Sequence, residues 1–89
     1  RQYQLIMQTD GNLVLYTASM KPVWASGTDG NPGAFALMQP DGNFVVYSGK
    51  LTPLWSTRTY GSQSNAIYVQ QDGNLVLYTA DMIAKWSIK

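Results

Sequence analysis

Five residue types recur together in this chain, and all of them carry side chains that suit recognition of a hydroxylated ligand. The segment from Gln8 to Tyr16 places Gln, Asp, Asn, Val and Tyr at alternate positions. A carboxylate accepts hydrogen bonds, amides donate and accept them, and a phenol does both. The vicinal hydroxyls of a hexose need this mixture of groups, and the valine offers a contact for ring C–H groups. The segment therefore indicates a sugar-binding site.

The same segment occurs three times at a constant step of 31 residues. A fixed period predicts one structural unit used repeatedly. Turn-forming junctions divide a single domain of residues 1–89 into units 1–31, 32–62 and 63–89. The candidate sugar-binding residues are Gln8, Asp10, Asn12, Val14 and Tyr16 in the first unit, Gln39, Asp41, Asn43, Val45 and Tyr47 in the second, and Gln70, Asp72, Asn74, Val76 and Tyr78 in the third.

The composition predicts an all-β fold, because Glu is absent and strand- and turn-forming residues are abundant. In the first unit we expect strands over residues 3–8 and 12–17, a tight turn at 9–11, and a third strand around Trp24. Such a unit is too small to bury its own apolar face. We therefore expect three antiparallel sheets packed about a pseudo-threefold axis.

Alternation along the strands assigns the motif side chains to one face of each hairpin and apolar residues to the other. The tryptophans each follow a motif tyrosine by eight positions, which favours a central aromatic cluster over sugar-stacking platforms. The expected core comprises Leu5, Met7, Leu13, Leu15, Met38, Phe44, Val46, Ile67, Val69, Leu75 and Leu77, with Trp24, Trp55 and Trp86. Three residues on the motif face are either pocket walls or cross-strand packing: Ile6, Leu37 and Tyr68.

Each Asp–Gly pair also suits a hairpin turn, so the aspartates alone indicate no more than a turn. The turn does not require the Gln before it or the Asn and Tyr after it. Because these three residues nevertheless recur in every unit, the complete motif favours ligand binding. On this interpretation Asn43→Ala removes one site and leaves the stability nearly unchanged.

Charge and residue content argue against several other functions. The net charge is +1 with no basic stripe, so nucleic acid is not an expected partner. No apolar run approaches the roughly 20 residues that a membrane span needs, so membrane insertion is not expected. His and Cys are absent and the five acids are scattered. We therefore expect neither an enzyme nor a metal or other cofactor.

With its motif present three times, the chain resembles the bulb-type mannose-specific lectins of monocots, whose signature is Gln-x-Asp-x-Asn-x-Val-x-Tyr on a β-prism II fold. The resemblance implies binding of mannose and mannose-rich glycans. It also implies that the Gln, Asp, Asn and Tyr side chains hydrogen-bond mannose hydroxyls, with Asp10 and Asn12 reading the axial one, while Val14 packs on the ring. A multivalent lectin of this kind is expected to be secreted or extracellular.

Family members usually begin with a further strand ahead of the equivalent of Tyr3, and this sequence begins at Arg1. We expect either a trimmed domain or a homo-oligomer that completes its sheets by strand exchange, and a first-unit pocket that depends on that strand. Two other functions stay open. The chain is alternatively the targeting domain of a larger toxin or receptor, or a protein-interaction module on the same fold that binds no sugar.

Overall fold

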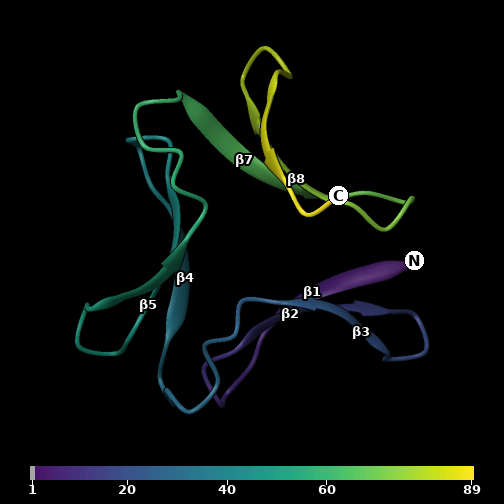
Figure 1. Ribbon diagram of the computed structural model, residues 1–89, viewed down its shortest axis with the longest axis vertical. Coiled ribbons are helices and arrows are strands. Elements are labelled where there is room, and N and C mark those ends of the chain that lie inside the picture. The colour runs from purple at the N-terminus through teal and green to yellow at the C-terminus, as the bar shows by residue number, and fades with distance from the viewer. Residues whose placement is uncertain (1) are drawn as a thin grey trace.

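The computed structural model describes residues 2–89 and forms nine strands in three antiparallel sheets (Figure 1). The sheets surround a central axis, and overall extents of 34 × 33 × 17 Å fit a flat body with pseudo-threefold symmetry. The expected all-β prism is confirmed. The first sheet contains β1 (Tyr3–Met7), β2 (Leu13–Thr17) and β3 (Pro22–Ala25), the second β4 (Phe35–Met38), β5 (Phe44–Tyr47) and β6 (Pro53–Ser56), and the third β7 (Ser64–Val69), β8 (Leu75–Thr79) and β9 (Ala84–Ser87).

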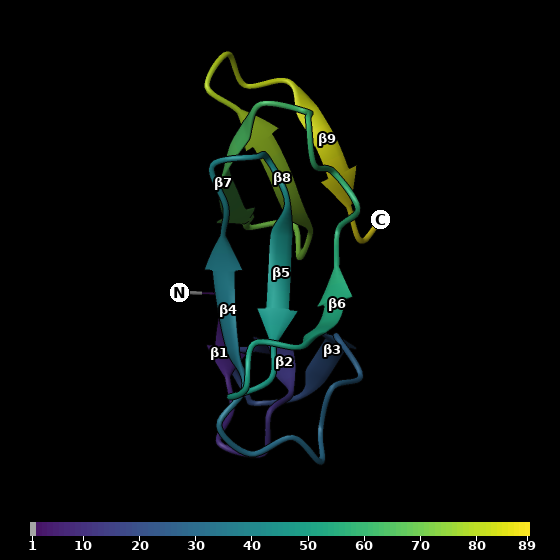
Figure 2. The same ribbon diagram turned by 90° about the vertical axis from the view of Figure 1, so that its left-hand side faces the viewer.

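Each sheet has its second strand in the middle, as the second sheet shows face-on in Figure 2. The middle strands are buried on both faces: Leu13, Val14 and Leu15 expose 3%, 3% and 0% of their surface. Burial on both faces explains why β2, β5 and β8 are continuous runs of apolar residues. Within residues 2–89 there is no helix of the length and apolarity that crossing a membrane requires.

The Asp–Gly pairs form the predicted hairpin turns. In the first unit the Gly11 N–H donates to the Gln8 carbonyl at 3.0 Å, and the Gln8 N–H donates to the Asn12 carbonyl at 2.9 Å. Gly11 has a φ of 92°, a left-handed conformation that glycine adopts without steric cost. Gln8 and Asn12 thus belong to the turn, and the two strands are each one residue shorter than predicted at this end.

The tryptophans join the three sheets at the axis. Each indole contacts the other two edge-on, with centroid distances of 5.3, 5.6 and 5.9 Å. The predicted aromatic cluster is therefore confirmed. The predicted core residues are buried or pack against the buried cluster, with one exception, Val69.

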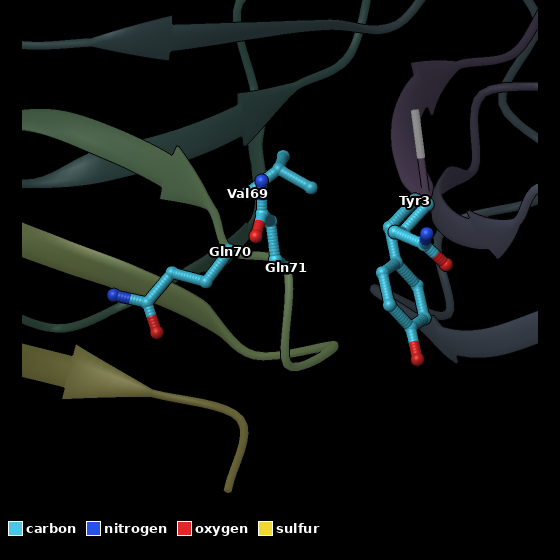
Figure 3. Close-up of a pocket in the computed structure, with 5 residues that line it drawn as sticks. Tyr3, Val69, Gln70 and Gln71 are labelled. Atoms are coloured by element: carbon cyan, nitrogen blue, oxygen red, sulfur yellow. The ribbon is translucent and has the colours of Figure 1, made fainter.

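Val69 corrects the predicted core, because it exposes 39% of its surface. It lines a cavity of about 340 Å³ between β1 and β7, across from Tyr3, as Figure 3 shows. The equivalent residues of the other units are the longer Met7 and Met38, and both reach the core cluster. Val69 thus lies at the cavity instead of in the core, although a cavity of about 410 Å³ also adjoins Met38 at the junction of the second and third sheets.

The turn glycines are where successive units meet. A Cβ on Gly11 would lie 2.2 Å from the Asn31 carbonyl oxygen, and one on Gly42 would lie 3.0 Å from the Gln63 nitrogen. In the third unit the neighbour of Gly73 is the aromatic ring of Tyr3, at 2.9 Å. Backbone at the junction with the next unit therefore covers Gly11, backbone and the Ser62 hydroxyl cover Gly42, and the Tyr3 ring covers Gly73.

The approach of Asn31 to Gly11 predicts a large loss of stability for Gly11→Ala. The new methyl group would overlap backbone, and the residue would have to keep a positive φ. We expect the free energy of unfolding to fall by about 2 kcal/mol or more. Urea denaturation followed by tryptophan fluorescence measures it.

Gly27→Ala is the matched control. Gly27 also has a positive φ, 74°, but nothing lies within 4 Å of the position that a Cβ would take there. Arg58 occupies the equivalent place in the second unit with a φ of 58°. We expect a loss of about 1 kcal/mol, and equal losses in the two variants would contradict the role given to the close approach.

Candidate functional site

The five motif side chains of each unit lie on one face of its sheet, opposite the tryptophans. The register pairs Val14 with Ile6 and Ala25, whereas Leu15 pairs with Trp24, so successive residues of β2 point to opposite faces. The same register holds in the other two sheets. The structure thus brings the fifteen predicted residues together as three sets of five, with the aspartate of each set at the hairpin tip.

A hydrogen bond between the motif glutamine and tyrosine spans the valine of each set. The Gln8 amide contacts the Tyr16 hydroxyl, Gln39 contacts Tyr47, and the Gln70 Nε2 donates to the Tyr78 hydroxyl at 2.6 Å. Each motif valine is only 3% exposed. The contact between valine and a sugar ring stays a prediction, since little valine surface is open to a ligand in this conformation.

In the second unit the Gln39 amide links the tyrosine to the aspartate. Its Oε1 accepts from the Tyr47 hydroxyl, and its Nε2 donates to the two Asp41 carboxylate oxygens at 3.1 and 3.2 Å. Asp41 Oδ1 also accepts from the Asn43 backbone N–H at 2.9 Å. The carboxylate is exposed beyond these contacts and is available to accept a hydrogen bond from a ligand hydroxyl.

The motif asparagines have a structural function that sequence reasoning missed. Asn12 Oδ1 accepts hydrogen bonds from the Gly27 and Thr28 backbone N–H groups at 3.0 and 3.2 Å. Asn43 Oδ1 accepts from Thr57 Oγ1 and the Thr59 N–H, both at 3.2 Å. These bonds tie the hairpin to the segment after the third strand.

The amide nitrogens of the same asparagines remain free for recognition. Within residues 2–89 the Nδ2 groups of Asn12, Asn43 and Asn74 donate to no protein acceptor, and no buried side-chain polar atom there lacks a partner. These N–H groups are therefore accessible to solvent. Each asparagine uses its oxygen for the fold and offers its nitrogen to a ligand.

Buried hydroxyls complete this support, and sequence reasoning missed them as well. Thr28 Oγ1 donates to the Gly11 carbonyl at 2.6 Å, and Thr59 Oγ1 donates to the Gly42 carbonyl at 2.7 Å. Thr28 and Thr57 are 5% and 6% exposed. A signal was present, because Ser26-x-Thr28 and Thr57-x-Thr59 follow the tryptophans at the period of the motif.

The third unit has different supports from the other two, and the dependence of the first-unit pocket on a further strand stays a prediction. The first unit has a full set of bonds around Asn12. In the third, Asn74 Oδ1 accepts from the Lys89 N–H at 3.2 Å, and the Lys89 ammonium donates to the Asp72 carbonyl at 2.5 Å. The first-unit pocket is thus built like the second in its polar groups.

These geometries favour recognition of hydroxyl groups. Each set presents one exposed carboxylate, a free amide N–H and a hydrogen-bonded Gln–Tyr pair on a sheet face. Among residues 2–89 no three His, Cys, Asp or Glu side chains come together in a way that would hold a metal ion. Glycosidases commonly use two carboxylates flanking one bond, and each set here has one.

The bonds to Asn43 Oδ1 change the expected effect of Asn43→Ala. The sequence alone predicts almost no change in stability, whereas the structure predicts a loss because the Thr59 N–H and the Thr57 hydroxyl would lose an acceptor. We expect the free energy of unfolding to fall by about 1 to 3 kcal/mol. Thermal denaturation followed by circular dichroism tests this.

Tyr47→Phe is the control for Asn43→Ala, because it changes a group that we assign to sugar recognition and not to support of the fold. It removes a hydroxyl whose protein contact is the Gln39 side chain, so we expect a change in stability of about 0.5 kcal/mol or less. Equal destabilisation by the two variants would contradict the division between supporting and recognising groups.

Structures similar to this chain have been solved, and they carry the same fold. A monocot mannose-binding lectin from Gastrodia elata, described as monomeric, is 41% identical with a TM-score of 0.85, over 97% of this chain and 78% of that one. The mannose-specific agglutinin of snowdrop, Galanthus nivalis, complexed with methyl-α-D-mannoside, is 41% identical with a TM-score of 0.82, over 96% and 79%. A lectin from Marasmius oreades is 30% identical with a TM-score of 0.85, over 99% and 73%. Neither family models nor curated proteins give a match.

Proposed function

We propose that this chain is a lectin for terminal α-mannose, since it belongs to the bulb-type, monocot mannose-binding lectins. The observation that carries the proposal is the recurrence of one polar arrangement on all three sheet faces, without a substitution at any motif position. Two of the similar proteins were solved with a mannoside bound, those from snowdrop and Polygonatum cyrtonema.

Recognition rests on complementary donors and acceptors. In the second unit the Asp41 carboxylate accepts from a mannose hydroxyl, and Asn43 Nδ2 donates to the same region, where the axial hydroxyl lies. Gln39 and Tyr47 bind hydroxyls farther along the ring. A sugar with one hydroxyl inverted leaves a site group unpaired, at a cost of about 1 to 3 kcal/mol.

A single site of this kind is weak. An open sheet face that binds one hexose gives a dissociation constant on the order of millimolar, or roughly −4 kcal/mol. The three sheets face in three directions (Figure 1), so one molecule presents three sites to a branched mannose-rich glycan or a glycan-covered surface. Linked sites raise the apparent affinity through effective concentration.

The remaining features of the proposal follow from this mode of action. The protein acts without catalysis or a cofactor, because binding the sugar is the whole activity. Mannose-rich glycans on cell surfaces and viruses are the proposed partners, so the proposed location is secreted or extracellular.

Calorimetric titration tests the function. We expect mannose to bind with heat and galactose to show none at equal concentration. Asp41→Asn keeps an oxygen for the Asn43 N–H but loses the charge, so we expect the second site to weaken by about tenfold or more. An absence of heat with mannose at high concentration would sink the lectin proposal and favour a protein-interaction module.

We also propose that copies of this chain associate through the open edges of their sheets. Every sheet has three strands, so two strands of each expose unpaired edges within residues 2–89. Val23 on the edge strand β3 is 49% exposed. Sedimentation velocity should show a species heavier than 9.9 kDa that increases with concentration, and a monomer at all concentrations would contradict association.

A further inference from the structure

The three motif faces share their polar groups but differ at the residue beside the motif valine. This position pairs directly with the valine from the neighbouring edge strand, as Ile6 with Val14, Leu37 with Val45, and Tyr68 with Val76. Paired residues of an antiparallel sheet point to the same face, with Cβ atoms about 5 Å apart. An aromatic ring therefore stands at the centre of the third face alone.

The Tyr68 ring is held in place and is still open to solvent. It packs edge-on against the motif tyrosine Tyr78, with centroids 5.2 Å apart and an interplanar angle of 85°. Tyr78 is itself anchored by its hydrogen bond from Gln70. Tyr68 nevertheless remains 42% exposed, whereas Val76 beneath the face is 3% exposed. Of the two paired residues at the centre of this face, Tyr68 is therefore the one that a ligand can reach.

From this arrangement we propose that Tyr68 is a platform for a second hexose, which makes the third site selective for mannose oligosaccharides over the monosaccharide. The inference rests on the proposed function. The polar groups lie on the β7–β8 turn and β8, and they hold the first ring. Tyr68 lies beside them on the edge strand β7, where a second sugar linked to the first ring toward that edge would contact it. The electron-rich face of an aromatic ring attracts polarised C–H groups such as those of a pyranose.

The other two faces provide internal controls. Leu37 is 45% exposed, as open as Tyr68, but it has no aromatic face. In the second unit the aromatic contact of the motif tyrosine is with Phe35, stacked at 5.8 Å and an angle of 29°. The fold accepts an aliphatic residue at this position in two units out of three, so exchanging residues between units should preserve the structure.

Site-resolved NMR tests the proposal. The side-chain amide resonances of Asn12, Asn43 and Asn74 report on the three sites during titration of the intact chain with methyl α-mannoside and with an α-linked dimannoside. We expect the dimannoside to gain roughly threefold to tenfold in affinity over the monosaccharide at the third site, beyond any gain at the other two.

Three variants test whether the aromatic ring causes the additional gain in affinity. Tyr68→Leu should remove the additional gain, Tyr68→Phe should keep it because the ring is retained, and Leu37→Tyr should create it at the second site. Equal gains at all three sites in the unsubstituted chain, or a gain that survives Tyr68→Leu, overturn the proposal and leave the lectin function standing. Absence of binding by both sugars at every site overturns the lectin function, and this inference with it.

Discussion

The contact of three indoles at the axis is the interaction on which the rest of the structure depends. Among residues 2–89 no strand hydrogen bonds join one sheet to another. Packing between their inner faces therefore joins the sheets, together with short junctions at the turn glycines. Trp24, Trp55 and Trp86 supply large apolar surfaces, and edge-on geometry lets each ring contact both others. Because the core faces inward on every sheet, all three outer faces are left for polar groups.

The polar groups on those faces serve the fold and the ligand at once. Asp41 Oδ1 stabilises the turn by accepting a hydrogen bond from the Asn43 N–H. Asn43 Oδ1 in turn accepts hydrogen bonds from the segment that follows β6. What remains for a ligand is the outward side of the carboxylate and the amide nitrogen, with the hydrogen-bonded Gln–Tyr pair beside them. A site made in this way is preorganised, because the same hydrogen bonds that fold the hairpin orient the groups that recognise a sugar.

Much of this was predictable from periodicity. The 31-residue step indicates three units, alternation assigns the faces, and the spacing of the tryptophans places them in the core. The supporting role of the asparagines was not predictable, because the partners of Asn12 Oδ1 lie 15 and 16 residues away at the end of another strand. The exposure of Val69 was not predictable either, because it lines a cavity at the junction between β1 and β7 together with Tyr3, which is far away in the sequence.

The repeat constrains some positions more tightly than others, and this explains how the three sites differ. The turn glycine lies against the junction between units, and the asparagine oxygen binds a neighbouring segment, so a change at either position disturbs folding as well as recognition. The position opposite the motif valine already holds three different residues, and two of them, Leu37 and Tyr68, are more than 40% exposed. Its identity is therefore free to vary without loss of the fold. A lectin with weak single sites gains affinity from multiplicity, and variation at this one position gives the three sites different preferences at little cost in stability.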